Sequence, residues 1–128
     1  MQDFERQAEA ALELYLQRGR LALKLLQRHR LDAALPVLKL RTAAFHNFRV
    51  ADVLRREVSK GAGKSGEVEV RWQSLWIAIE RVDARLAEVL ERMKSEASRE
   101  LEKVCERKIQ LAKFRSHKPY SSSFEKSV

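Results

Sequence analysis

The sequence predicts an all-α protein, in which an antiparallel helical hairpin and a long third helix form a three-helix bundle. Its 128 residues include only four glycines and two prolines, and 34% of them are charged, a balance typical of amphipathic helices. From residue 68 onward, apolar residues recur in alternating steps of four and three, as in a coiled coil. Three of the four glycines lie within residues 59–66, and this cluster predicts an exposed loop before the third helix.

The first helix is predicted over residues 3–29, because apolar residues recur there mostly at helical spacing. These residues are Phe4, Ala8, Ala11, Leu12, Tyr15, Leu21, Leu25 and Leu26. Gly19 is a weak point in this helix, costing up to about 1 kcal/mol relative to alanine. The cations at residues 28–30 suit a helix C-terminus. We therefore expect a tight turn over residues 29–32, with Asp32 as the N-cap of the next helix.

The second helix is predicted over residues 32–57. Pro36 falls close to its first turn, where few amide donors are committed to helical hydrogen bonds. The residues expected on its apolar face are Leu35, Leu38, Ala44, Phe45, Phe48, Ala51 and Leu54. Phe45 and Phe48, like Trp72 and Trp76 in the third helix, are close enough along the helix to share one face. We expect both aromatic pairs to pack in the core.

The third helix has the most regular pattern of the chain. Its apolar seam consists of Val68, Trp72, Leu75, Ile79, Val82, Leu86, Val89 and Met93. Trp76 and Leu90 widen this seam enough for it to face two partner helices. Residues 67–118 contain no glycine or proline, so the helix is expected to continue to Phe114. A break near Ser95 would instead fold its end back as a fourth helix.

The predicted helices differ greatly in length. At about 1.5 Å per residue, the first two each span roughly 40 Å and the third roughly 70 Å. About twenty residues at the end of the third helix would then lack a partner within the chain. We predict one helical domain over residues 1–114, followed by a flexible tail over residues 115–128, which is serine-rich and has no periodicity.

Composition narrows the class of function. The chain has a single cysteine, Cys105, its N-terminus does not resemble a signal peptide, and charges interrupt every apolar stretch. We expect a cytoplasmic protein without a membrane span. The histidines His29, His46 and His117 are too scattered to predict a metal site, and a slim bundle offers little concavity for catalysis. We therefore expect a binding protein without enzymatic activity, cofactor or metal.

The segment Gly61-Ala62-Gly63-Lys64-Ser65 partly matches a phosphate-binding loop, which needs glycines followed by Lys and Ser or Thr. Val58 occupies the position of the first required glycine. The segment before the loop is also predicted as a helix, whereas this motif follows a strand. We interpret residues 61–66 as a linker.

The net charge of +8 predicts attraction to anionic partners. One cationic cluster, without an acidic residue from position 107 to 123, is a candidate anion-binding site: Arg107, Lys108, Lys113, Arg115 and Lys118. It could neutralise up to about five phosphates, and binding would then depend steeply on salt. The simpler interpretation is a solvated helix end, where the cations interact favourably with the negative end of the helix dipole.

The chain resembles the short helical chaperones of flagellar type III export, of the FlgN and FliT kind. Residues 21–38, LALKLLQRHRLDAALPVL, look like the first helix, tight polar turn and second helix of that family. Arg41 and the apolar residues up to Phe48 follow where the family has an arginine and a further apolar face. The glycine loop and the long helix over residues 68–114 extend the resemblance to most of the chain.

The resemblance implies a chaperone that binds an amphipathic terminal helix of an export substrate. In that family the C-terminal helix commonly contacts the ligand. The matching apolar residues here are Leu101, Val104, Ile109, Leu111 and Phe114. Two alternatives stay open: a basic protein that binds nucleic acid, and a structural homodimer that pairs through the helix face over residues 93–111.

Overall fold

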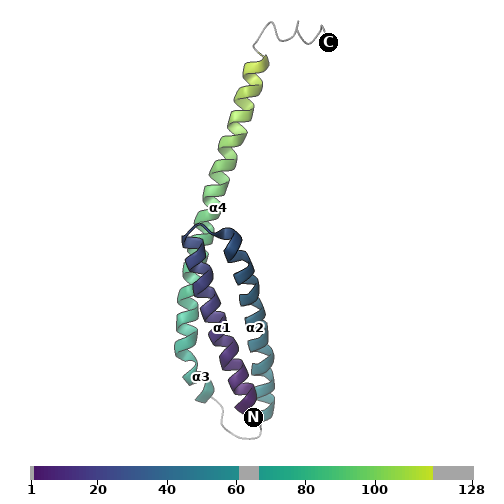
Figure 1. The fold of residues 1–128 in the computed structure, drawn as a ribbon, viewed down its shortest axis with the longest axis vertical. Helices are drawn as coiled ribbons and strands as arrows, with labels where there is room; N and C mark the ends of the chain where they lie inside the picture. Colours follow the sequence, from purple (N-terminus) through teal and green to yellow (C-terminus); the bar gives the residue numbers. More distant parts are fainter. Residues whose placement is uncertain (1, 61–66, 117–128) are drawn as a thin grey trace. The chain divides into compact units, whose positions relative to one another are not determined.

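The protein is described by a computed structural model, which covers residues 2–60 and 67–116 (Figure 1). These residues form α1 (Gln2–Gln27), α2 (Leu31–Ser59), α3 (Glu67–Arg71) and α4 (Gln73–Ser116), with no strand among them. The predicted all-α class is confirmed, and the helices of the hairpin begin and end close to the expected positions.

The chain divides into two compact units, Met1–Val89 and Leu90–Val128. The first contains α1, α2, α3 and the beginning of α4, and the described part of the second is the rest of α4. The domain predicted over residues 1–114 is thus divided between them. Because α4 passes Ser95 without a break, no fourth helix forms by folding back. The predicted tail begins inside this helix, and its residues 117–128 lie outside the described part of the chain.

The core of the α1–α2 hairpin includes many small side chains beside its buried leucines and Phe48. Helix axes approach more closely when the residues between them are small, and α1 and α2 lie side by side along the hairpin. The buried alanines of this hairpin are Ala8, Ala11 and Ala22 on α1 and Ala34, Ala44 and Ala51 on α2. Large apolar residues at the same positions would force the two helices apart.

The coiled-coil seam predicted for the third helix forms the remaining side of the core. Its buried members are Trp72, Ile79, Val82, Leu86 and Val89. Phe48 of α2 contacts both indoles, with ring centroids 5.7 Å from Trp72 and 5.5 Å from Trp76. Phe48 and Trp72 are buried as expected, whereas Phe45 and Trp76 are only half-buried. Trp72 separates α3 from α4, but its amide still donates to the carbonyl of Val68 at 2.9 Å, so the predicted helix is interrupted at one residue only.

The turn between α1 and α2 is a Schellman motif. The amide of Arg30 donates to the carbonyl of Leu25 at 2.8 Å, and the amide of His29 donates to that of Leu26 at 3.0 Å. His29 occupies the left-handed position of the motif, with φ of 58°. The residue at the N-cap of α2 is Arg30, whose side chain makes no capping bond. The predicted N-cap, Asp32, instead lies in the first turn and pairs with Arg30.

Replacing His29 by glycine is expected to stabilise the protein by about 0.5–1 kcal/mol, because a left-handed L-residue costs about 1–2 kcal/mol and glycine loses only part of that gain to backbone entropy. Thermal unfolding followed by circular dichroism should show a melting temperature a few degrees higher, at about 4–8 °C per kcal/mol. His29→Ala is the control, since alanine keeps the strain and should not raise the melting temperature. A lower melting temperature for the glycine variant would contradict the motif.

Arg41 is the central polar residue of the first unit, and its side chain is only 9% exposed. Its Nε donates to the carbonyl of Tyr15 at 3.1 Å, and its Nη2 donates to Asp83 at 2.6 Å, so that it joins α1, α2 and α4. The guanidinium also lies 3.8 Å from the centroid of the Tyr15 ring. A Cβ on Gly19 would stand 2.7 Å from Arg41 Nε. The glycine expected to be a weak point is therefore what admits Arg41 to the helix backbone.

Polar contacts also fasten α3 to both helices of the hairpin. Buried Arg55 donates to Glu69 at 2.8 Å, and this hydrogen bond is the main cause that holds the pKa of Glu69 below its ordinary value. On the α1 side, Glu9 accepts a hydrogen bond from the indole nitrogen of Trp72 at 2.9 Å. Arg71 pairs with Glu5 and Glu9. These contacts fix the start of α4 and the position of Trp72 in the core.

Candidate binding surfaces

The second unit exposes all of its predicted contact residues. Every described side chain over residues 94–115 is exposed, including the large apolar ones. Leu101 is 65% exposed and Phe114 is 58% exposed. Because the described part of this unit is one helix, it contains no second element that could cover these side chains.

Helical geometry brings only some of the predicted residues together. At about 100° per residue, Leu101, Val104 and Leu111 fall within an arc of about 80°. Leu90 and Ala97 continue the same line toward the first unit, and we call this set of five residues the α4 stripe. Phe114 lies about 60° beyond Leu111, at the edge of the stripe. Ile109 lies about 160° from Leu111 and about 80° from Leu101, which places it outside the stripe.

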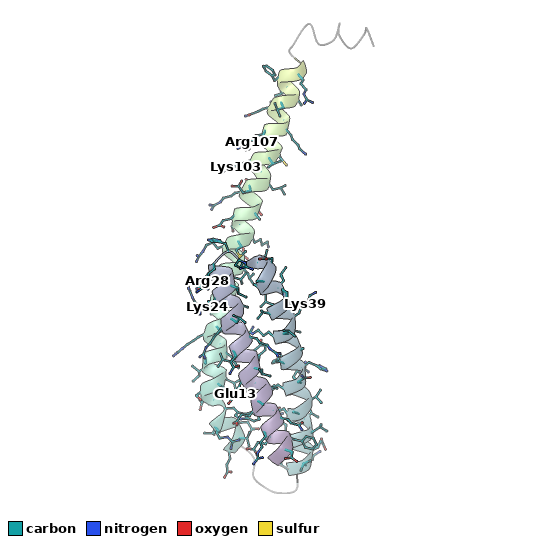
Figure 2. All side chains as sticks on the ribbon, in the orientation of Figure 1. Glu13, Lys24, Arg28, Lys39, Lys103 and Arg107 are labelled. Atoms are coloured by element: carbon teal, nitrogen blue, oxygen red, sulfur yellow. The ribbon has the colours of Figure 1, made fainter. Side chains whose placement is uncertain are left out.

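The predicted cationic cluster does not form one face. Lys108 and Arg115 are seven residues apart and lie on the α4 stripe itself, whereas Arg107 and Lys113 lie about 100° or more away on different sides. Figure 2 shows Lys103 and Arg107 along this part of α4. Lys118, the last member of the cluster, lies outside the described residues. The cations of α4 therefore surround the helix.

The α1–α2 hairpin carries a second apolar surface that the sequence patterns did not separate from the core. Leu21, Leu35 and Leu54, which were expected on the apolar faces of their helices, are 47%, 51% and 41% exposed. A shallow groove between the two helices, which no α3 or α4 residue lines, passes Leu54. We call it the hairpin groove, and its lining includes Gln7, Ala10, Leu14, His46, Val50 and Leu54.

Most of the net charge of the protein lies in the part of the hairpin around its turn, over residues 14–51. Residues 14–51 include eight lysines and arginines but only one acidic residue, Asp32. The other acidic residues of α1 and α2 lie at positions 3–13 and 52–57, away from the turn between the two helices. Figure 2 shows Lys24 and Arg28 on α1 and Lys39 on α2 near the α1–α2 turn, with Glu13 farther from it.

Other kinds of site find no support among the described residues. His, Cys, Asp and Glu side chains of residues 2–60 and 67–116 form no group that could hold a metal ion. The glycine segment of residues 61–66 lies outside those ranges, and Cys105 is exposed on α4. No described helix is long and apolar enough to cross a membrane. The chain matches no family model, no curated protein and no solved structure.

Proposed function

We propose that the protein is a helical binding protein whose α4 stripe pairs with an amphipathic segment of a partner protein. The observation that carries this proposal is the exposure of Leu101, Val104 and Leu111 on one face of α4. Fully burying such a side chain is worth about 1.5–3 kcal/mol, so three of them supply much of the energy of a helix–helix interface. A lone helix in water is also marginally stable, and a partner would support it.

The partner class follows from the resemblance to flagellar export chaperones. In this interpretation the protein holds the amphipathic terminal helix of a secreted subunit and keeps it from associating prematurely. Pairing an amphipathic helix against an apolar face uses anchors at helical spacing, as the α4 stripe provides. A cytoplasmic location belongs to the same proposal.

Two observations make the alternatives weaker than pairing with another protein. A nucleic-acid site needs cations on one side of the helix, but Arg107, Lys108 and Lys113 lie on different sides. A parallel homodimer through the α4 stripe would bring Lys108 of each copy close to the other, and a lysine in such a seam lowers stability.

A pair of matched variants tests the proposal. Leu101 lies on the stripe and Ile109 lies about 120° from the centre of the stripe, and both residues are apolar and exposed. Glutamate at either position changes the charge equally. The full chain, Leu101→Glu, Ile109→Glu and a version ending at Met93 are used to capture proteins from host lysate, and the retained protein is identified and its affinity measured with purified components. We expect Leu101→Glu to weaken binding by about tenfold or more, equivalent to about 1.4 kcal/mol, and Ile109→Glu to change it less than about twofold.

The chaperone interpretation expects a secreted protein with an amphipathic terminal segment, lost on truncation. Equal loss with both glutamate variants, or binding that survives truncation at Met93, would contradict the α4 stripe as the site. Recovered nucleic acid that dissociates in moderate salt would support the cationic alternative. A dimeric solution mass that Leu101→Glu abolishes would support the homodimer.

A further inference from the structure

We propose that the hairpin groove is a second, independent docking site, which binds an acidic amphipathic helix of a protein partner. This site lies entirely within the first unit, Met1–Val89, and does not depend on the function proposed for the α4 stripe.

The groove has the apolar floor that a helix requires. Leu14 on α1 and Val50 and Leu54 on α2 line it, with exposed fractions of 40–47%. Leu21 lies seven residues after Leu14, and Leu40 lies fourteen before Leu54, so each helix repeats an apolar residue on nearly the same face. Arg18 of α1 donates to the carbonyl of Leu40 at 2.8 Å, which sets these two leucines at a similar level of the hairpin. The apolar surface therefore extends from the groove toward the α1–α2 turn.

Cations border this surface on both helices. Arg28 follows Leu21 by seven residues, and Lys39 precedes Val50 by eleven, so each lies within about 20° of the apolar residue that it follows or precedes. Lys24 lies one turn before Arg28 on the same side of α1. All three are exposed, and their side chains form no hydrogen bond or ion pair with other described residues. Glu13 and Glu57 are acidic residues beside the groove, and both lie away from the turn.

The apolar floor and the cationic border together indicate which class of ligand the hairpin groove binds. A second copy of the chain would bring the same cations against one another, which opposes association. Nucleic acid would satisfy the cations but leave the leucines and Val50 without a counterpart. A helix with leucines on one face and carboxylates along its borders satisfies both, and about 18 residues, or ~27 Å, would cover the groove and the region near the turn.

The test uses the full chain and a labelled synthetic helix of about 18 residues, with leucine at helical spacing and glutamate at most other positions, measured by fluorescence anisotropy. Val50→Glu is expected to weaken binding by about tenfold or more, and Ile77→Glu by less than about twofold. Ile77 is the matched control because it is 44% exposed on α4 and does not line the groove. Lys39→Glu should weaken binding several-fold more than Arg49→Glu. Arg49→Glu makes the same charge change on α2 but lies about 100° from the groove residue Val50.

Circular dichroism verifies that each variant keeps its helices, and Leu14→Gln tests the same groove from α1 if Val50→Glu does not fold. Leu101→Glu on the α4 stripe is expected to leave binding of this peptide unchanged, which separates the two sites. The proposal is overturned if Ile77→Glu weakens binding as much as Val50→Glu, or if a peptide with lysine in place of glutamate binds equally well. It is also overturned if replacing the peptide's leucines by serine has no effect, or if only duplex DNA binds, since either result indicates a purely anionic ligand.

Discussion

Replacing Trp72 by alanine is expected to lower the free energy of unfolding by about 3–5 kcal/mol, the largest effect of any single substitution considered for this chain. The indole is almost completely buried, contacts Phe48 and donates a hydrogen bond to Glu9. Alanine would leave a large cavity between α2 and the start of α4. Chemical denaturation followed by circular dichroism measures the change.

Trp72→Phe separates packing from hydrogen bonding in this prediction. Phenylalanine keeps much of the volume but cannot donate to Glu9, so the expected loss is about 1–2 kcal/mol. Trp76, which is only half-buried, provides a second comparison, and Trp76→Ala should cost clearly less than Trp72→Ala. Equal losses at the two tryptophans would be inconsistent with the burial of Trp72.

Gly19→Ala is expected to destabilise the protein by about 2 kcal/mol, although alanine is the better helix former by up to about 1 kcal/mol. The added Cβ would stand 2.7 Å from Arg41 Nε and would displace a guanidinium that is held by Tyr15 and Asp83. Denaturation of the variant and the parent protein gives the difference directly.

In a protein that already carries Arg41→Ala, the effect of Gly19→Ala on the free energy of unfolding is expected to have the opposite sign. The three atoms nearest to a Cβ at position 19 all belong to the guanidinium, so in its absence Gly19→Ala should stabilise the helix by up to about 1 kcal/mol. The coupling between the two positions is then about 3 kcal/mol, at the upper end of what contacting residues show. A cycle with no coupling would show that Gly19 serves some purpose other than admitting Arg41.

The fold was predictable because the apolar residues of the third helix recur in steps of four and three, a spacing that places them all on one face of a helix. The role of Gly19 was not predictable, since it depends on Arg41 in the next helix. Arg41 and Arg55 were absent from the expected core because charged residues are seldom buried without partners. Leu21 and Leu54 were placed on the apolar faces of their helices, but periodicity does not show whether another helix covers such a face.

Among the candidate contact residues of α4, too, some could be placed correctly from the sequence and others could not. Leu101, Val104 and Leu111 could be grouped from the sequence, because helical angles follow from residue spacing alone. Ile109 was included for its hydrophobicity, although its angle places it outside the stripe. The hairpin groove required the structure, because it is formed by two helices whose relative rotation is set by buried alanines and by Arg41.

The alanine-lined contact between α1 and α2 has a consequence for how the two helices can slide. A shift of one helical turn, about 5.4 Å, would bring a large side chain to the place of a buried alanine, since Leu12, Leu26 and Phe48 follow Ala8, Ala22 and Ala44 by four residues. Arg18 donates to the carbonyl of Leu40 on the opposite helix, and Arg41 donates to that of Tyr15. Each bond ties a side chain of one helix to a fixed backbone atom of the other. The pair therefore acts as an axial lock, which holds α1 and α2 in one register whatever the groove binds.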